Sequence, residues 1–191
     1  MTDNLINHIA FFIPVSTELR SRLEAISKAE KVDKGHFLHT PEKTSFKTFY
    51  INKGLVRIYY LKDGKEITDN FAAETEWITS IYSFLKNVPD HFYIQTLEES
   101  ELVGIALDDL ETCFNDFPEM ERFGRILISK YFLEQSERII SLQFHSAKER
   151  YEFFSKTSKN KLQRVPLGML ASHLGMTLET LSRVRSKKDA F

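Results

Sequence analysis

The residues with the most suggestive chemistry lie near the end of the chain, in VPLGMLASHLGMTLETLSRVRSK (residues 165–187). Two short runs with helical spacing of apolar residues are separated there by Gly175, which can adopt the left-handed conformation that ends a helix. Thr177 is a suitable cap for the second helix. That helix would present side chains able to bond base edges and phosphates, together with one apolar side chain, Leu178. The polar set is Thr177, Glu179, Thr180, Ser182, Arg183 and Lys187.

Two interpretations fit this stretch. The apolar residues alone predict an ordinary packed helical hairpin, with Leu167, Leu170, Ala171, Leu174, Leu181 and Val184 at its core. The order helix, three-residue turn, helix is also that of helix-turn-helix DNA-binding proteins. Arg suits guanine, and Glu suits the amino group of cytosine. The spacing favours DNA recognition. His173, on the first helix, is a candidate for the DNA backbone or a plain surface residue.

Charge is distributed unevenly along the chain. The net charge is only -1, but residues 1–147 carry 16 Lys and Arg against 23 Asp and Glu, whereas residues 148–191 carry 10 against 4. A basic segment beside an acidic one favours a nucleic-acid partner. The alternative is a basic surface that is simply solvated.

The elements that must position this stretch begin with a β-rich region from Gly35 to Leu107. Five segments rich in β-branched and aromatic residues follow one another at about ten-residue spacing without intervening helices, which predicts an antiparallel roll or sandwich of barrel-like form. They are FKTFYINKG, LVRIYYLKDG, KEITDNFAA, HFYIQTLEES and ELVGIAL. Asn52-Lys53-Gly54 and Asp63-Gly64 fit hairpin turns. Before this region, residues 5–29 predict two short helices separated by Pro14, with Ser16 or Thr17 as a cap.

Helical spacing returns at LDDLETCFNDF (residues 107–117), and Pro118 then opens a helix that continues to about Phe144. A helix of about 25 residues is about 38 Å long. Such a helix bridges two domains, pairs with a second copy, or lies on its own domain. Met120, Phe123, Leu127 and Tyr131 form the predicted dimer surface. Ile126, Ile128, Phe132, Leu133 and Ile140 spread apolar character over further faces. A helix in SAKERYEFFSK and a polar linker, TSKNKLQR, follow.

Signs of catalysis or of a cofactor are weak. Gly35, Gly54 and Gly64 are too scattered for a phosphate loop, and no nucleophile has an evident partner. His36 and His39 would point to opposite faces of a strand, which argues against a metal site. The lone Cys113 fits a small core residue. The sequence therefore predicts a non-enzyme without metal or cofactor.

No run of about 18 apolar residues is present, which predicts a protein that does not span a membrane. The N-terminus MTDNLINHIAFFIPV lacks the features of a secretion signal. We therefore expect a cytoplasmic location.

The order SAKERYEFF, polar linker, VPLGMLASHLGMTLETLSRVRSK resembles the C-terminal domain of Crp/Fnr-type bacterial transcription regulators. The likeness is to short members that end in an LGxTxETLSRxR signature and lack a C-terminal wing. NKGLVRIYYLKDGKEI resembles the hairpins of the family's cyclic-nucleotide-binding β-roll. The resemblance implies an α+β chain with an antiparallel β-roll (double-stranded β-helix) and flanking helices as a sensor domain at 1–117. It further implies a long dimerisation helix at 118–144 and a helix-turn-helix domain at 145–191.

The resemblance also implies a homodimer whose two recognition helices enter successive major grooves of a pseudo-palindromic double-stranded site. Glu179 and Arg183 match base-contacting positions, and Thr177 and Thr180 match phosphate contacts. Leu178 departs from the family, where Arg is common, so the first base pair is either unread or met through a thymine methyl group. RNA polymerase and an unknown small-molecule effector are further candidate partners.

The resemblance makes cyclic AMP an unexpected ligand here. Relatives that bind it hold the ribose with Gly-Glu and the phosphate with Arg-Ser, whereas this chain has Thr79-Ser80 and Asp90-His91 at those positions. A carboxylate in place of the cation repels the phosphate. We therefore expect no binding of cyclic AMP in the usual mode.

A different ligand is one remaining use for the roll. The candidate pocket residues are Trp77, Ser80, Tyr82, Ser83, Asp90, His91 and Tyr93, and the alternative is that the aromatic ones simply fill the roll. Two other functions compete with transcription regulation. One is a small-molecule sensor with secondary DNA contact, and the other is a β-roll interaction or enzymatic module with an incidental helical tail.

Overall fold

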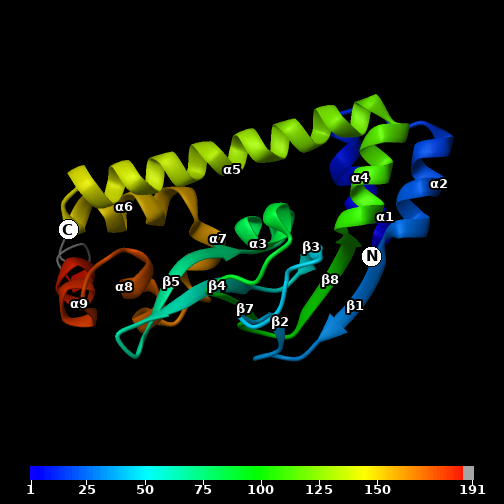
Figure 1. The fold of residues 1–191 in the computed structure, drawn as a ribbon. Helices are drawn as coiled ribbons and strands as arrows, with labels where there is room; N and C mark the ends of the chain where they lie inside the picture. The colour runs from blue at the N-terminus through cyan, green and yellow to red at the C-terminus, as the bar shows by residue number, and fades with distance from the viewer. Residues whose placement is uncertain (187–191) are drawn as a thin grey trace.

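A computed structural model describes residues 1–186, which form two antiparallel sheets, one very long helix and a helical segment at each end (Figure 1). The N-terminal part contains α1 (Thr2–Ala10), α2 (Thr17–Ile26), β1 (Lys28–Val32), β2 (Phe37–His39), β3 (Lys47–Lys53), β4 (Val56–Lys62), β5 (Lys65–Ala72), β6 (Trp77–Ile78), α3 (Ile81–Lys86), β7 (Phe92–Thr96) and β8 (Ser100–Ala106). The remainder contains α4 (Leu107–Asp116), α5 (Pro118–Phe144), α6 (Ala147–Thr157), α7 (Lys159–Leu162), α8 (Leu167–His173) and α9 (Leu178–Ser186).

The strands form the predicted antiparallel roll. One sheet has the order β1-β8-β3-β6 and the other β2-β7-β4-β5, so β5 lies at an edge. Apolar residues of the two sheets, such as Ile51, Ile58 and Ile94, form the core between them. At the β4–β5 hairpin, Asp63 and Gly64 have φ values of 51° and 72°, as a type I′ turn requires. The sequence did not indicate β1, β2 and β6, which have five residues or fewer.

The two predicted N-terminal helices are present and cover one sheet of the roll. The Ser16 side chain accepts a hydrogen bond from the Leu19 amide and caps α2. Apolar residues of α1 and α2, including Leu5 and Leu23, share a core with Val103 of β8 and with the start of α5. Cys113 is fully buried in this core, and burial raises the pKa of its thiol to about 11. It is a core residue, as expected from the sequence.

The long helix α5 runs across the whole molecule, from the N-terminal helices to the C-terminal helices (Figure 1). Its predicted start at Pro118 and end at Phe144 are confirmed. Two residues assigned to a dimer surface, Met120 and Phe123, are instead buried in the chain's own core, and Leu127 packs against the same core. Spacing alone did not separate the faces, because apolar residues occur all around this helix.

The C-terminal helices pack on the roll more closely than the sequence suggested. Ser146 and Glu149 form a capping box at the start of α6. The segment interpreted as a polar linker contains α7, and Lys161 within it is buried. A shared core joins Leu55 and Phe71 of the roll to residues of α6, α8 and α9, including Tyr151, Leu170 and Leu181. The helical hairpin is therefore docked on the roll.

Candidate nucleic-acid interface and ligand cavity

Helix α9 lies at the end of the molecule opposite α1 and α2, with one side free of contacts to the roll (Figure 1). Leu181 is fully buried and Val184 partly buried, and both pack against α6 and α8. Most of the predicted DNA-contacting residues are exposed on the other side, and Thr180 is partly exposed. The exposed residues are Thr177, Leu178, Glu179, Ser182 and Arg183. Lys187, also predicted to contact DNA, lies outside the described residues.

The first turn of α9 is ordered by its own polar groups. The Thr177 hydroxyl accepts a hydrogen bond from the Thr180 amide at 3.2 Å, as expected for a cap. Hydrogen bonds from the Glu179 amide and from Thr177 lower the pKa of the Glu179 carboxyl below its usual value. The carboxylate is therefore ionised and accepts hydrogen bonds only, which suits contact with an amino group on a base.

His173 is not a surface residue, contrary to one expectation. Its ring lies between Phe71 of β5 and Phe154 of α6, at centroid distances of 5.3 and 5.5 Å. Because a carbonyl oxygen only accepts, the Nδ1 atom at 2.9 Å from the Asp69 carbonyl oxygen carries a proton and donates it. Burial, with the nearby positive charge of Arg138, lowers the pKa of His173 to about 3. The ring is therefore neutral at physiological pH and contributes to docking.

Part of the basic charge near the C-terminus faces the roll. Arg164 pairs with Glu74 at 2.9 Å and with Glu98 at 2.5 Å. Lys161 pairs with Glu76 at 2.6 Å and donates to the Phe71 carbonyl oxygen at 2.9 Å. These two cations stabilise the contact between the helices and the roll and are not available to DNA. The excess of basic residues near the C-terminus therefore includes both cations that face the roll and exposed ones, such as Arg183 on α9.

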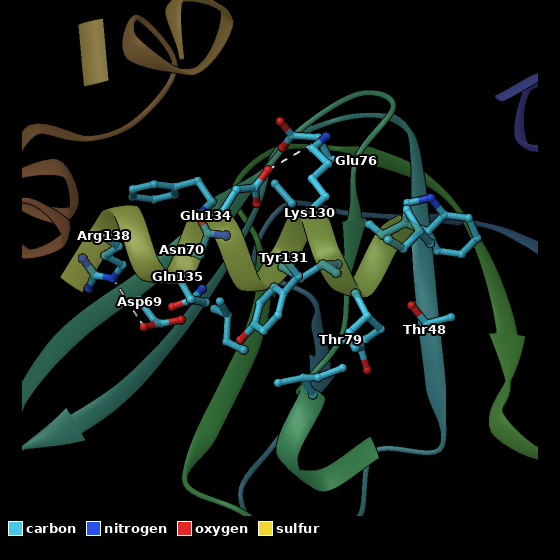
Figure 2. Close-up of a pocket in the computed structure, with 18 of the residues that line it drawn as sticks. Thr48, Asp69, Asn70, Glu76, Thr79, Lys130, Tyr131, Glu134, Gln135 and Arg138 are labelled. Carbon is cyan, nitrogen blue, oxygen red and sulfur yellow. Dashed lines mark hydrogen bonds and ion pairs between the residues drawn. The ribbon is translucent and has the colours of Figure 1, made fainter. Parts of the chain in front are cut away.

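A large cavity, about 660 Å³, extends between α5 and the roll. Tyr131 and Gln135 of α5 lie across it from Thr48 and Thr79, with the Asp69–Arg138 ion pair toward one end (Figure 2). Apolar residues such as Ile58, Phe84, Ile105 and Trp77 form most of the remaining lining. Charged side chains, including Glu76, Lys130 and Glu134, also line the cavity (Figure 2). The Trp77 indole nitrogen is buried without a partner in the described part of the chain.

The residues predicted to line a ligand pocket do not come together. Of the seven, Trp77 alone lines the cavity. Tyr82 and His91 are exposed, and Tyr93 stacks on Tyr59 at 4.9 Å. Ser83 donates to the Val88 carbonyl oxygen and accepts from the Ser45 amide. Sequence reasoning missed Gln135 and Asp69, and it assigned Tyr131 to a dimer surface, because the cavity is formed by segments far apart in the sequence.

Ser80 and Asp90, which occupy two of the positions aligned with the nucleotide-binding segment, bond to each other. The Ser80 hydroxyl donates to one Asp90 oxygen, and His39 Nε2 donates to the other at 3.1 Å. The Phe92 amide donates to Asp90 at 2.9 Å. Burial favours a higher pKa for Asp90, but these hydrogen bonds together lower it below its usual value. The carboxylate is ionised and its bonds are made within the chain.

This network differs from the machinery of a serine hydrolase. There, the imidazole lies between the hydroxyl and the carboxylate and removes the hydroxyl proton. Here the Asp90 carboxylate lies between Ser80 and His39, and all three side chains are buried. The arrangement supplies a structural network and no activated nucleophile. Within residues 1–186, no group of three or more His, Cys, Asp or Glu side chains is arranged to hold a metal ion.

Several solved structures share this fold. FixK2 from Bradyrhizobium japonicum aligns with a TM-score of 0.76 and 17% identity over 86% of this chain and 85% of that one. CLP from Xanthomonas campestris, a c-di-GMP responsive global regulator, aligns with a TM-score of 0.70 and 19% identity over 89% and 90%. A Crp/Fnr-family regulator structure from Eubacterium rectale aligns with a TM-score of 0.70 and 17% identity over 94% and 88%.

These likenesses confirm the predicted fold: a β-roll followed by a long helix and a helical C-terminal segment, as in Crp/Fnr regulators. No family model matches the sequence, and no curated protein matches it. Within the described residues, no helix combines the length and apolar character needed to cross a membrane.

Proposed function

We propose that this protein is a sequence-specific DNA-binding transcription regulator of the bacterial Crp/Fnr type, acting as a homodimer in the cytoplasm. The observation that carries the proposal is α9, a capped helix whose Glu179, Ser182 and Arg183 side chains are exposed on a helical hairpin docked to a β-roll. The fold shared with Crp/Fnr regulators supports it. RNA polymerase is a further proposed partner, on the resemblance of the sequence alone.

The proposed DNA function is tested by selecting bound DNA from a random pool, with and without cell extract as a source of effector. We expect enrichment of a sequence with two-fold symmetry and binding that weakens steeply with salt. Enrichment only in the presence of extract would identify dependence on an effector. Failure to enrich any sequence under either condition, even at low salt, would contradict sequence-specific recognition.

The proposed homodimer uses the outward side of α5. Six large apolar residues on this side are exposed. The largest exposed fractions are those of Phe144 (76%), Phe132 (68%) and Leu133 (61%). The six are Ile128, Phe132, Leu133, Ile139, Ile140 and Phe144. This exposed apolar surface, here called the strip, lies on a long helix and is expected to pair with a second copy. This strip replaces the surface that the sequence had suggested.

Analytical ultracentrifugation tests the dimer. The variant Phe132→Glu places a charge on the strip and is expected to sediment as a monomer at micromolar concentration. Phe11→Glu is the matched control, because Phe11 is also exposed, at 84%, but lies at the end of α1. A wild-type chain that sediments as a monomer, or a Phe132→Glu variant that remains dimeric, would contradict this surface.

We further propose that cyclic AMP does not bind in the family's usual mode. The observation in support is the buried Asp90 carboxylate, which stands where a phosphate-binding cation is expected and already accepts three hydrogen bonds. Calorimetry is expected to show no binding of cyclic AMP at micromolar concentration. Micromolar binding that an Asp90→Asn substitution alters would overturn the proposal.

A second candidate function, sensing of a small molecule, is favoured by the cavity beneath α5. Its lining is mostly apolar with neutral groups such as Thr48, Thr79 and Gln135, and several of its charged groups are paired with one another, as in Asp69–Arg138 and Lys130–Glu134. This suits a weakly polar ligand without net charge. Trp77 lines the cavity and is the single tryptophan of the chain, so its fluorescence reports on occupation directly. An emission shift with fractionated extract, abolished by Thr79→Phe, which fills part of the cavity without adding a second tryptophan, would support the sensor. No shift with any fraction would count against it.

A further inference from the structure

Near the C-terminal end of α5, the roll, the long helix and the first helix of the hairpin meet at one side chain, Arg138. Its Nη1 atom donates to the His173 carbonyl oxygen at 3.0 Å, and Nη2 lies 3.4 Å from the Thr68 carbonyl oxygen. Its Nε atom is 3.6 Å from the Asp69 carboxylate. The planar guanidinium, with five fixed donors, is suited to contact three acceptors at once.

One of these acceptors, the His173 carbonyl oxygen, lies at the C-terminal end of α8. The His173 carbonyl is among the last of α8, where carbonyl groups lack partners within the helix. A cation at that position also interacts favourably with the helix dipole. Arg138 therefore stabilises the end of α8 directly, immediately before the turn that leads to α9.

The same end of α8 is bonded to the open edge of β5. The Ser172 hydroxyl accepts from the Thr68 amide at 3.0 Å and donates to the Glu66 carbonyl oxygen at 3.1 Å. These are the bonds that a neighbouring strand would make to this edge. The contact of Arg138 with the Thr68 carbonyl continues the series. Hydrogen bonds to Glu66 and Thr68 of β5 thus fix the position of α8 along the edge of the roll.

The turn after α8 also lies against α5. Gly175 has a φ of 63°, and a Cβ atom there would be 2.8 Å from a Leu142 methyl group, one turn after Arg138. Arg150 joins the same two segments, because it donates to the His145 carbonyl oxygen at the end of α5 and lies 3.3 Å from the Gly175 carbonyl oxygen. Arg138 and Leu142, one turn apart on α5, therefore both contact the residues that lead into α9, and Arg150 of α6 joins the end of α5 to the same turn.

We propose that Arg138 is a positioning residue that fixes the angle of α9 relative to α5 and thereby sets the spacing of the half-sites that a dimer accepts. The inference rests on the proposed function, because half-sites matter only if two copies of α9 read DNA. If two copies pair through α5, any variation in the angle between α5 and α9 occurs in both copies. Both variations then change the distance between the two α9 helices. Paired recognition helices must match half-sites about 34 Å apart, or a multiple of this.

The first test compares operators whose half-sites are moved closer or farther by one base pair. Wild type is expected to prefer one spacing sharply. Arg138→Gln is expected to lose on the order of 10-fold to 100-fold at that spacing, because simultaneous engagement is impaired. It should bind a single half-site as wild type does, which a merely unfolded variant would not. Arg138→Lys, which keeps the charge without the planar fork, should recover part of the preference.

Arg122→Gln is the matched control, since Arg122 is exposed in the second turn of the same helix. It should leave affinity and spacing preference unchanged. An Arg138→Gln variant that keeps the wild-type preference would overturn the inference. A wild-type protein that binds no DNA specifically would instead contradict the proposed function, so the two failures are distinguishable.

A second measurement does not use DNA. Spin labels on cysteines at Lys130 of α5 and Ser182 of α9, both exposed, report the distance between the helices, while Cys113 is buried and stays in place. Labelled chains are diluted into unlabelled ones so that distances within one chain dominate. Wild type and the Arg122→Gln control should give one narrow distribution, and Arg138→Gln a broad one. Equal widths in all three would overturn the inference even if DNA binding is lost.

Discussion

The segment around α3 and the helix α9 are both short, both carry several polar side chains, and both contain residues that the sequence indicates as candidates for binding. In the first, Ser80, Ser83 and Asp90 are buried and form their hydrogen bonds with other groups of the chain. In the second, Glu179, Ser182 and Arg183 project into solvent. A polar group whose bonds are already made stabilises a fold, whereas an exposed set on a rigid helix is available to a partner.

This difference in exposure bears on whether each region can bind a partner. At α3, a ligand would have to replace internal hydrogen bonds before it formed its own, which makes binding there unfavourable. At α9, the hydrogen bonds of the exposed Thr177 and Glu179 side chains lie within the first turn of the helix itself, so a partner could approach without disrupting the contact with the roll. The boundary between the two kinds of residue falls within the hairpin itself, because Ser172 and His173 of α8 are bonded to β5.

Removal of the Asp90 carboxylate is expected to have the largest effect. In Asp90→Ala, His39, Ser80 and the Phe92 amide lose a shared acceptor in a buried site, which should lower the free energy of unfolding by about 3 kcal/mol. Urea denaturation measures it. The exposed Glu42→Ala control should change by no more than about 0.5 kcal/mol. Equal effects of the two substitutions would show that the α3 segment is not held by this network.

Two arginines of the C-terminal segment should respond in opposite ways. Arg183→Ala is expected to weaken binding to the selected operator by about 1–3 kcal/mol and to leave the melting temperature unchanged. Arg164→Ala removes the partner of Glu74 and Glu98 and should lower the melting temperature with less effect on operator affinity. Calorimetry and DNA titration measure both. Unchanged operator affinity in Arg183→Ala would count against α9 as the reading helix.

The contribution of His173 should depend on pH. The pKa of its imidazole is about 3 in the folded chain and about 6.5 in the unfolded one, so between these values the unfolded state binds more protons. Stability from this group is therefore complete above pH 6.5 and falls as the pH drops, by about 2 kcal/mol at pH 5. His173→Asn keeps a donor toward the Asp69 carbonyl but does not titrate. Its unfolding free energy should depend less on pH between 5 and 7, and an identical dependence would contradict a neutral, buried His173.

The elements with strong periodicity were predictable from the sequence. The roll, the start of α5 at Pro118, and the hairpin around Gly175 follow from alternation, from proline and glycine positions, and from apolar spacing. The short strand β6, with two residues, is too short for a pattern to appear. The segment with Lys161 and Arg164 looked like a polar linker, yet the partners of these two cations are glutamates 66 to 90 residues away in the sequence.

The candidate sites were predictable to different degrees, because one lies within a single helix and the other is formed by segments far apart in the sequence. The residues predicted to contact DNA lie within one helix, so spacing along the sequence determines which of them share a face. The cavity requires α5 to lie beside β5 and α3, which no local pattern encodes. The exposed face of α5 was also hidden, because Phe123 and Phe132 belong to one apolar helix and only the fold shows that the first is buried and the second is not.

The smallest expected effect concerns Leu178, the one apolar side chain among the exposed residues of α9, at 47% exposure. If it contacts a thymine methyl group, Leu178→Ala should lose about 0.5–1 kcal/mol on an operator with thymine at the first position of each half-site, and nothing on operators with other bases there. Leu178→Met, of similar volume, should keep most of the discrimination.

Competition titrations with operators that differ only at that base pair measure this difference. If wild type itself binds all four versions equally, the position is unread, and Leu178 is exposed without a recognition role. Discrimination by wild type that survives in Leu178→Ala would assign the base pair to another side chain, with Glu179 and Ser182 the nearest exposed ones on the same helix. If Leu178→Ala loses the discrimination at that base pair while Leu178→Met keeps it, an exposed apolar residue of α9 takes part in reading DNA alongside the polar ones.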